Sequence, residues 1–227
     1  MKLDRRTLLA GSSAAFLSPL AASQAHADAK RQSLVDQSLA SARKVITGKD
    51  FPDAAKQMSK ARGVLVIPEL VQGGFIIGAA GGRGTLLTRS GPGNWSYPGF
   101  WGMGSGSLGL QIGGKVSEIV FIIFTEKGLN ALLDNRFKFG AEAGITMVAV
   151  GAGFEGATTG AAGADILAFA NSNGLFAGAS LEGSYIDADD DWNALYYGAG
   201  ANGRAILLDR RYSNPGAEPI RQFFARW

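Results

Sequence analysis

Cysteine and histidine, which supply many of the nucleophiles, general bases and metal ligands in enzymes, are almost missing from this sequence. The 227 residues contain no cysteine and a single histidine, His26. Without cysteine the chain has no thiolate nucleophile, disulfide, zinc–thiolate site or iron–sulfur cluster. His26 lies in a segment that we expect to be cleaved, which also excludes Ser-His-Asp catalysis and His-ligated metals. We therefore expect no enzymatic activity and no cofactor.

Three glycine-rich segments resemble nucleotide-binding loops but lack the context that such loops need. Residues 104–109 and 198–203 fit the spacing G-x-G-x-x-G, which binds dinucleotides only where it joins a strand to a helix. No helical pattern follows either segment. Residues 109–116 nearly match a P-loop, but Val116 stands where a hydroxyl should reach Mg²⁺. With 33 glycines in the chain, chance matches are expected, and we reject all three as nucleotide sites.

Carboxylates are the remaining candidates for acid–base or metal chemistry. Asp187–Asp191 alternates oxygens as calcium loops do, but Trp192 and Gly198 stand where an EF-hand requires Gly and Glu. We interpret this segment as a solvated acidic turn between two strands, with a weak structural calcium site as the alternative. Hydrolysis by paired carboxylates would need two of these acidic residues close together, but their spacing selects no pair. The candidates are Glu69, Glu118, Glu142, Glu155, Asp165 and Glu182.

Basic residues concentrate around two predicted N-terminal helices. They are Arg43, Lys44, Lys49, Lys56, Lys60 and Arg62, and Lys115 on a predicted exposed turn offers a further contact to an anion. Cations near anionic headgroups contribute about 1 kcal/mol each, and the apolar face of an amphipathic helix adds burial. The set therefore predicts a surface that binds phospholipid headgroups. A merely solvated helix face is the alternative.

Two helices open the part of the chain that must position these residues. Apolar residues recur at three- and four-residue steps from Asp28 to about Arg62. Gly48 ends the first helix, and Asp50 is the expected N-cap of the second.

After Gly63 the apolar period becomes that of short strands separated by glycine. We expect strands over residues 64–67, 75–77, 85–88, 107–112, 116–124, 145–150, 166–170, 175–186, 194–197 and 205–208. Thr125 to Asp134 predicts a short helix, and Pro219 to Phe224 a last helical turn. The expected fold class is α+β, with N-terminal amphipathic helices packed on a Gly-rich twisted antiparallel β-sheet or small β-barrel.

Residues 1–27 have the features of a cleaved export signal. Arg5-Arg6-Thr7-Leu8-Leu9 resembles a twin-arginine signal, and an apolar stretch then leads to the small-x-small site Ala25-His26-Ala27. An ordinary secretory signal is the alternative. Either signal predicts a periplasmic protein with residues 28–227 as one domain and no transmembrane span in the mature chain. Cleavage lowers the formal charge from +3 to about +1, so nucleic acid is not an expected partner.

Ordered sequence blocks over residues 37–210 resemble the SYLF lipid-binding domain family. The blocks are Ala61–Pro68, Gly73–Gly78, Gly82–Gly84, Trp95–Pro98, Gly109–Gly113, Ala164–Leu167, Gly174–Ser184 and Tyr196–Gly198. The resemblance implies binding of phospholipids, phosphoinositides in eukaryotic members, through a basic surface and an N-terminal amphipathic helix. Relatives include fungal actin-patch proteins with SH3 domains, but an exported protein of bacterial type would not meet actin. The resemblance implies no catalytic residues.

These observations predict a non-enzymatic protein that binds anionic, phosphoinositide-like phospholipid headgroups at a membrane surface in the bacterial cell envelope. The alternative is a structural or envelope protein-interaction module that binds a protein or glycan partner. An aromatic cluster of Trp95, Tyr97, Phe100 and Trp101 is the expected contact in that case. The same cluster is also typical of a packing plug that closes one end of a barrel.

Overall fold

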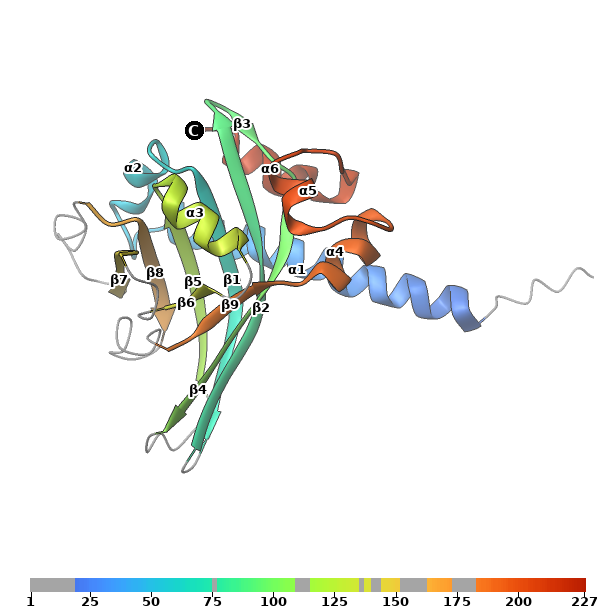
Figure 1. Cartoon of the computed structure of the whole chain (residues 1–227), viewed down its shortest axis with the longest axis horizontal. Helices are drawn as coiled ribbons and strands as arrows, with labels where there is room; N and C mark the ends of the chain where they lie inside the picture. Colours follow the sequence, from blue (N-terminus) through green and yellow to red (C-terminus); the bar gives the residue numbers. More distant parts are fainter. Residues whose placement is uncertain are drawn as a thin grey trace, which may run out of the picture.

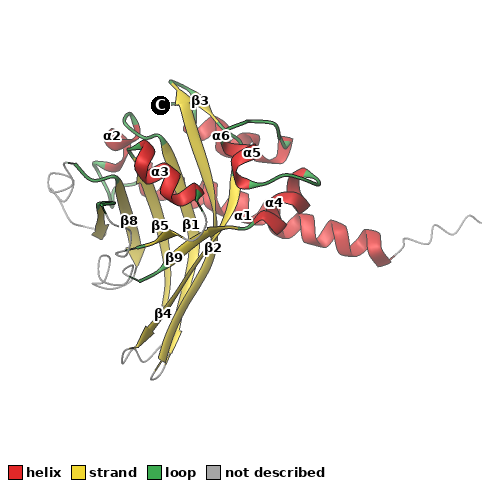
Figure 2. Ribbon diagram, viewed as in Figure 1, coloured by secondary structure: helices red, strands yellow, loops and turns green. Residues whose placement is uncertain are grey.

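One curled sheet dominates the structure, and helices cover both of its faces (Figure 1, Figure 2). The computed structural model describes residues 19–74, 77–108, 115–134, 137–139, 144–151, 163–172 and 183–227. Within these residues the strands are β1 (Gly63–Gly74), β2 (Ile77–Gly91), β3 (Asn94–Trp95), β4 (Gly99–Leu108), β5 (Lys115–Ile123), β6 (Phe137–Lys138), β7 (Met147–Gly151), β8 (Ile166–Ser172) and β9 (Tyr185–Ala188).

The strand order is β6-β9-β4-β2-β1-β5-β8-β7, and β3 pairs with β2. Every described pairing is antiparallel except that of β7 with β8, which is parallel. The expected α+β class is confirmed, and the sheet curls into a half-barrel, although it is mixed rather than purely antiparallel.

The helices are α1 (Pro19–Thr47), α2 (Ala54–Met58), α3 (Glu126–Leu133), α4 (Asp190–Tyr197), α5 (Gly203–Leu207), the 3₁₀ turn η1 (Pro215–Ala217) and α6 (Glu218–Phe224). Among the described residues, none of these helices is both long and apolar enough to cross a bilayer. Helix α1 runs through the expected cleavage site Ala25–Ala27 without a break. Helix α2 begins later than expected, with Asp53 rather than Asp50 as its N-cap residue.

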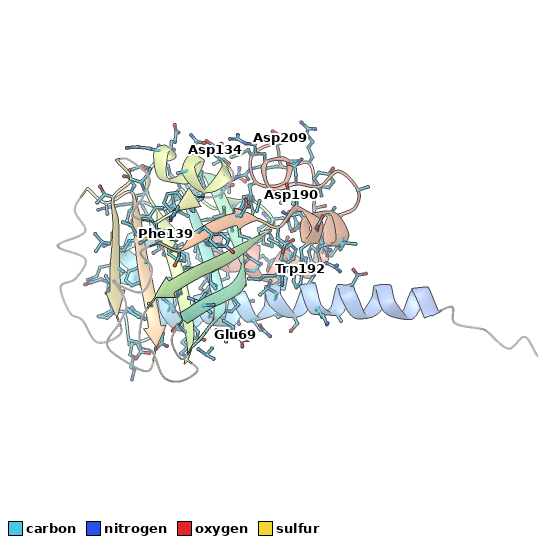
Figure 3. The ribbon with its side chains drawn as sticks, turned by 60° about the horizontal axis from the view of Figure 1, so that its bottom comes forward. Glu69, Asp134, Phe139, Asp190, Trp192 and Asp209 are labelled. Carbon is cyan, nitrogen blue, oxygen red and sulfur yellow. The ribbon has the colours of Figure 1, made fainter. Side chains whose placement is uncertain are left out.

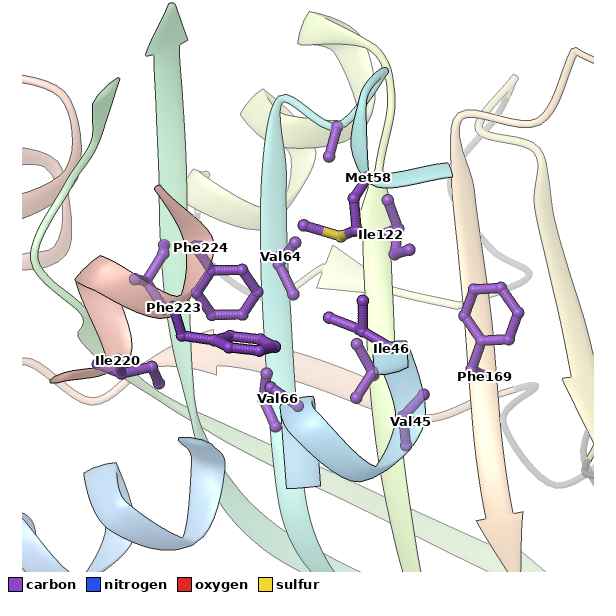
Figure 4. Packing of buried hydrophobic residues seen from close by; sticks show 14 of the residues in the cluster. Val45, Ile46, Met58, Val64, Val66, Ile122, Phe169, Ile220, Phe223 and Phe224 are labelled. Carbon is purple, nitrogen blue, oxygen red and sulfur yellow. The ribbon is translucent and has the colours of Figure 1, made fainter. Parts of the chain in front are cut away.

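Strand alternation divides the buried residues into two cores, one on each face of the sheet. On one face, Val64 and Val66 of β1 pack with residues of α1, α2 and α6 in what we name the α1-side core (Figure 4). On the other face, Leu65 and Ile67 pack with residues of α3 and α5 in the α3-side core. Both faces of this part of the sheet are therefore buried, which explains why its strands are nearly continuously apolar.

Helix α1 crosses the α1-side face and covers only part of it. Toward the end of the ladder where Gly63 pairs with Ile123, Val66 of β1 and Val120 of β5 are completely buried. Toward the other end, Val71 of β1 is 48% exposed, and its ladder partner Val116 of β5 is 56% exposed. This side of the sheet therefore has a covered half beneath the helices and an open half beyond α1.

Local sequence signals predicted some elements correctly and two wrongly. Thr125 caps α3 by accepting a hydrogen bond from the backbone N–H of Gly128, at 3.0 Å. The predicted strands at 194–197 and 205–208 are wrong, because residues 194–197 belong to α4 and residues 205–207 to α5. Their N-caps are Asp189 and Asn202, whose side chains accept from the backbone three residues later. The P-loop-like residues 109–114 and most of the expected strand 175–186 lie outside the described residues.

Candidate functional site

The structure places six of the predicted headgroup-binding residues on or beside the first two helices. Arg43 and Lys44 lie near the end of α1, Lys49 follows it, and Lys56 belongs to α2. Lys60 and Arg62 lie between α2 and β1. All six residues are exposed at the surface.

Lys115 is separated from this group by the length of a strand. It begins β5, whose other end, Ile123, pairs with Gly63 next to Arg62. Eight steps at 3.4 Å per residue put Lys115 about 27 Å along the strand from that end. Its backbone lies in β5, but its side chain lies outside the described residues. The structure therefore does not bring Lys115 to the predicted surface.

Among the described residues, three of the six cations have a carboxylate partner. Lys44 Nζ lies 2.5 Å from Glu118 Oε2, Lys56 Nζ lies 2.9 Å from Asp53 Oδ1, and Arg62 Nη1 lies 2.9 Å from Glu126 Oε1. Exposed ion pairs of this kind contribute only about 0–1 kcal/mol to stability. The pairs instead lower the net charge of the surface and direct Arg62 toward α3.

Arg226 joins the group through the tertiary structure. Its guanidinium carbon lies 5.2 Å from the ring centre of Phe223, and the guanidinium carbon of Arg43 lies 5.8 Å from the same ring. Both distances allow cation–π attraction. The two arginines are 183 positions apart in the sequence, so no local pattern could have joined them. We name Arg43, Lys49, Lys56, Lys60 and Arg226 the cationic surface.

The helices beneath the cationic surface are fixed by buried apolar side chains. Val45 and Ile46 of α1, Met58 of α2, and Phe223 and Phe224 of α6 are at most 3% exposed, and they belong to one core (Figure 4). Burying such side chains contributes about 1.5–3 kcal/mol each. The backbone positions of the cations are therefore set by a packed core.

The acidic segment Asp187–Asp191 leads from β9 into a helix and not into a second strand. Asp189 caps α4, accepting from the backbone N–H of Trp192 at 3.2 Å, and it also accepts from Arg83 Nε at 2.8 Å. Asp190 accepts from the backbone N–H of Gly203, at 2.9 Å. Two of its carboxylates thus have structural roles, and among the described residues no cluster of three or more acidic or histidine side chains could hold a metal ion.

The other carboxylates considered for hydrolysis are held apart by their own partners. Glu118 binds α1 through Lys44 and Ser41. Asp165 accepts from Thr125 Oγ1 at 2.6 Å and from the backbone of Thr146 at 2.9 Å. The Thr125 hydrogen bond is the main cause of a lowered pKa of Asp165. Glu69 is exposed on β1, and Glu142, Glu155 and Glu182 lie outside the described residues.

The aromatic cluster is buried rather than arranged along a cleft. Trp95 and Phe100 lie in the α1-side core, and Trp101 lies in the α3-side core with its indole N–H donating to the Leu132 carbonyl at 3.1 Å. All three are at most 1% exposed. Tyr97 is half-buried, and its hydroxyl donates to Glu218 at 2.9 Å. The cluster therefore packs the two cores and presents no aromatic surface for a glycan.

Comparison with known proteins gives a match over most of this fold. The model of a family described as Ysc84, Las17-binding protein actin regulator, matches residues 104–226. The chain is 28% identical over 172 residues to LAS seventeen-binding protein 3 of Saccharomyces cerevisiae, covering 74% of this chain and 37% of the yeast protein. It is 30% identical over 156 residues to human SH3 domain-containing YSC84-like protein 1, covering 67% of this chain and 45% of the human protein. The chain thus spans less than half the length of these relatives.

Proposed function

This chain belongs to the Ysc84 family of SYLF domains, and from that premise we propose that it is a non-enzymatic protein that binds anionic phospholipid headgroups. The family is described by Las17 binding and actin regulation, and the relatives are named for Las17 binding and for containing an SH3 domain. Lipid-headgroup binding, which the SYLF resemblance implies, is the property that fits a protein exported from the cell. The proposed location is the bacterial cell envelope, because residues 1–27 carry the features of an export signal.

The cationic surface is the observation that carries this proposal. In the same segment Asp50 is exposed and Asp53 pairs with Lys56, so the five cations and these two carboxylates sum to a formal charge of +3. Each cation near an anionic bilayer contributes about 1 kcal/mol to the binding free energy. At 0.1 M salt this attraction is largely screened at distances beyond about 10 Å. The expected binding is therefore weak, peripheral and sensitive to salt. A phosphoinositide-like headgroup, with several negative charges, fits a cluster of this sign better than a zwitterionic one.

Liposome flotation of the whole chain tests the proposal. We expect binding to rise with the fraction of anionic lipid and to fall between 50 and 500 mM salt, on the order of tenfold. The double variant Lys49→Glu/Lys60→Glu should abolish most of the binding. Neither lysine has an ion pair among the described residues, so the substitutions break no ion pair of the described fold.

The control, matched in charge, is Lys138→Glu/Arg211→Glu, at exposed positions outside α1, α2 and α6. It also breaks the exposed ion pair of Arg211 with Asp209, which contributes only about 0–1 kcal/mol to stability. The proposal requires the control to bind like the parent chain. Equal losses in both double variants would mean that only the net charge matters and would remove the cationic surface as the site. Binding that ignores both salt and anionic lipid would overturn the headgroup proposal itself.

A further inference from the structure

A long hollow lies along α1 on the open half of the sheet face. Its main part has a volume of about 790 Å³ and lies between α1, the lower strands and the N-terminus of α4. We name it the acidic trough and define it by Glu69, Val71, Gly102, Tyr185, Asp191 and Trp192. Figure 3 shows Glu69 and Trp192 close to α1. A second hollow of about 400 Å³ shares Gln37 and Glu69 with the first, so the two adjoin along the helix.

The floor of the trough is backbone and apolar surface. A Cβ atom added at Gly81 or Gly102 would meet no atom within 4 Å, so both glycines face open space. Beside them Val71 is 48% exposed and Tyr185 50% exposed. Val116, in the second hollow, continues the apolar floor across the β1–β5 ladder. A contiguous apolar strip on a sheet face is typical of a surface that another chain covers.

The rim of the trough carries a clear excess of negative charge. Glu69, Asp187, Asp190 and Asp191 line it, and the guanidinium of Arg83 is held by Asp189 at 2.8 Å. In the second hollow Lys44 is likewise paired with Glu118. Among the described lining residues, both cations thus have a carboxylate partner, and Glu69, Asp190 and Asp191 add further negative charge. An anionic membrane or a nucleic acid would be repelled here.

We propose that the acidic trough binds a cationic amphipathic segment of a partner protein. Apolar side chains of that segment would lie on Val71, Tyr185 and the glycine floor, and its Lys or Arg side chains would meet the rim carboxylates. Two adjoining hollows along α1 suit an extended polypeptide better than one small ligand. This site does not rest on the headgroup proposal, because the two sites use different faces of α1. Arg43 of the cationic surface faces α6, whereas Gln37, Ser41 and Lys44 line the second hollow.

Binding of defined peptides to the whole chain tests this site. The probe is a fluorescein-labelled heptapeptide of alternating Leu and Lys, followed by anisotropy, with Leu-Glu and Ser-Lys heptapeptides as comparisons. We expect the Leu-Lys peptide to bind at least tenfold more tightly than either comparison peptide. Gly102→Val should weaken its binding at least tenfold, because the new side chain fills the open floor without changing any charge.

The control for Gly102→Val is Gly91→Val, since Gly91 also faces open space but lies at the β2–β3 turn. Its peptide affinity should equal that of the parent chain. Asp191→Lys, at an exposed position of α4, provides a second variant that tests the rim if Gly102→Val does not fold. We expect a loss of at least tenfold there also.

Three outcomes would overturn the proposal. The first is equal binding of the Leu-Lys peptide to the parent chain, Gly102→Val and Asp191→Lys. The second is equal binding of the Leu-Glu peptide. The third is concentration-dependent self-association, measured by sedimentation, that Gly102→Val abolishes, which would make a second copy the occupant. Flotation of Gly102→Val should match that of the parent chain, so failure at the trough and failure at the cationic surface are distinguishable.

Discussion

Lys44 of α1 and Glu118 of β5 form an ion pair across the boundary between helix and sheet, with Nζ 2.5 Å from Oε2. Glu118 also accepts from Ser41 Oγ at 3.2 Å and from Asn171 Nδ2 at 3.3 Å. One carboxylate thus links the last turns of α1 to two strands, on the side of α1 that faces the hollows. Removing the Glu118 carboxylate should therefore lower the free energy of unfolding more than removing the Lys44 ammonium group does.

Glu118→Ala should lower the free energy of unfolding by about 1–2 kcal/mol, because it leaves three donors without their acceptor. Lys44→Ala should lower it by less than about 1 kcal/mol, because the lysine is half-exposed and Glu118 keeps two other donors. Urea unfolding followed by tryptophan fluorescence measures both values. Equal losses would show that the ion pair alone, and not the wider network, holds the helix.

Glu218 makes the stability of the protein depend on acid pH. Arg221 donates to both of its carboxylate oxygens, at 2.9 and 2.6 Å, and is the main cause of a pKa lowered to about 2. Tyr97 and Gln222 add further hydrogen bonds.

A carboxylate with a lowered pKa in the folded state stabilises that state above its ordinary pKa of 4.5. This stabilisation is lost as the pH falls from about 4.5 toward 2. Glu218→Gln should therefore flatten the fall in the free energy of unfolding between these pH values, measured by urea titration. Glu69→Gln, an exposed site on β1, is the control. A parent-like acid profile in Glu218→Gln would refute the assignment.

Substitution by alanine should affect stability very differently at two glycines of β2. A Cβ at Gly84 would overlap the Val66 carbonyl oxygen, next to the irregular register between Val66 and Glu69 of β1. Gly84→Ala should thus lose about 3 kcal/mol of stability. Gly81→Ala meets open space and should change stability by less than about 1 kcal/mol. Thermal unfolding distinguishes the two, and similar melting temperatures would contradict the close approach.

Asn193 joins α4 to β4 through a buried side chain. Its Oδ1 accepts from the backbone N–H of Phe100 at 2.8 Å, and the residue has no exposed surface. Asn193→Ala leaves that N–H buried without a partner, so we expect a loss of about 2–3 kcal/mol. Asn130→Ala, at an exposed position of α3, should change stability by no more than about 0.5 kcal/mol. Chemical denaturation of the two variants measures these losses in the free energy of unfolding. Equal losses would contradict the role of Asn193.

Local signals explain both the correct and the wrong predictions for individual elements. A helix over Thr125 to Asp134 is predicted correctly because a helical apolar pattern follows Thr125. The same kind of signal was present at Asp189, with Asp190 and Asp191 in the first turn. It was missed because the apolar and aromatic residues up to Tyr197 also favour a strand. Asn202 was missed similarly, since Ala205–Leu208 is too short for its period to distinguish a helix from a strand.

The sequence by itself determined that the chain has no cysteine chemistry, and it predicted the type of fold that the chain adopts. The absence of cysteine, the change of apolar period near Gly63 and the basic residues of the first helices are local properties. Such properties depend on residue type and spacing, which can be read without knowing what packs against what.

Only the tertiary structure decided which charges share a surface. It placed Arg226 beside Arg43 over Phe223, left Lys115 a strand's length away, and gathered Glu69 with Asp187–Asp191 along α1. These neighbours are distant in the chain, and their meeting depends on how the sheet curls and where α1 crosses it. That geometry follows from the packing of both cores together, so no single segment contains it.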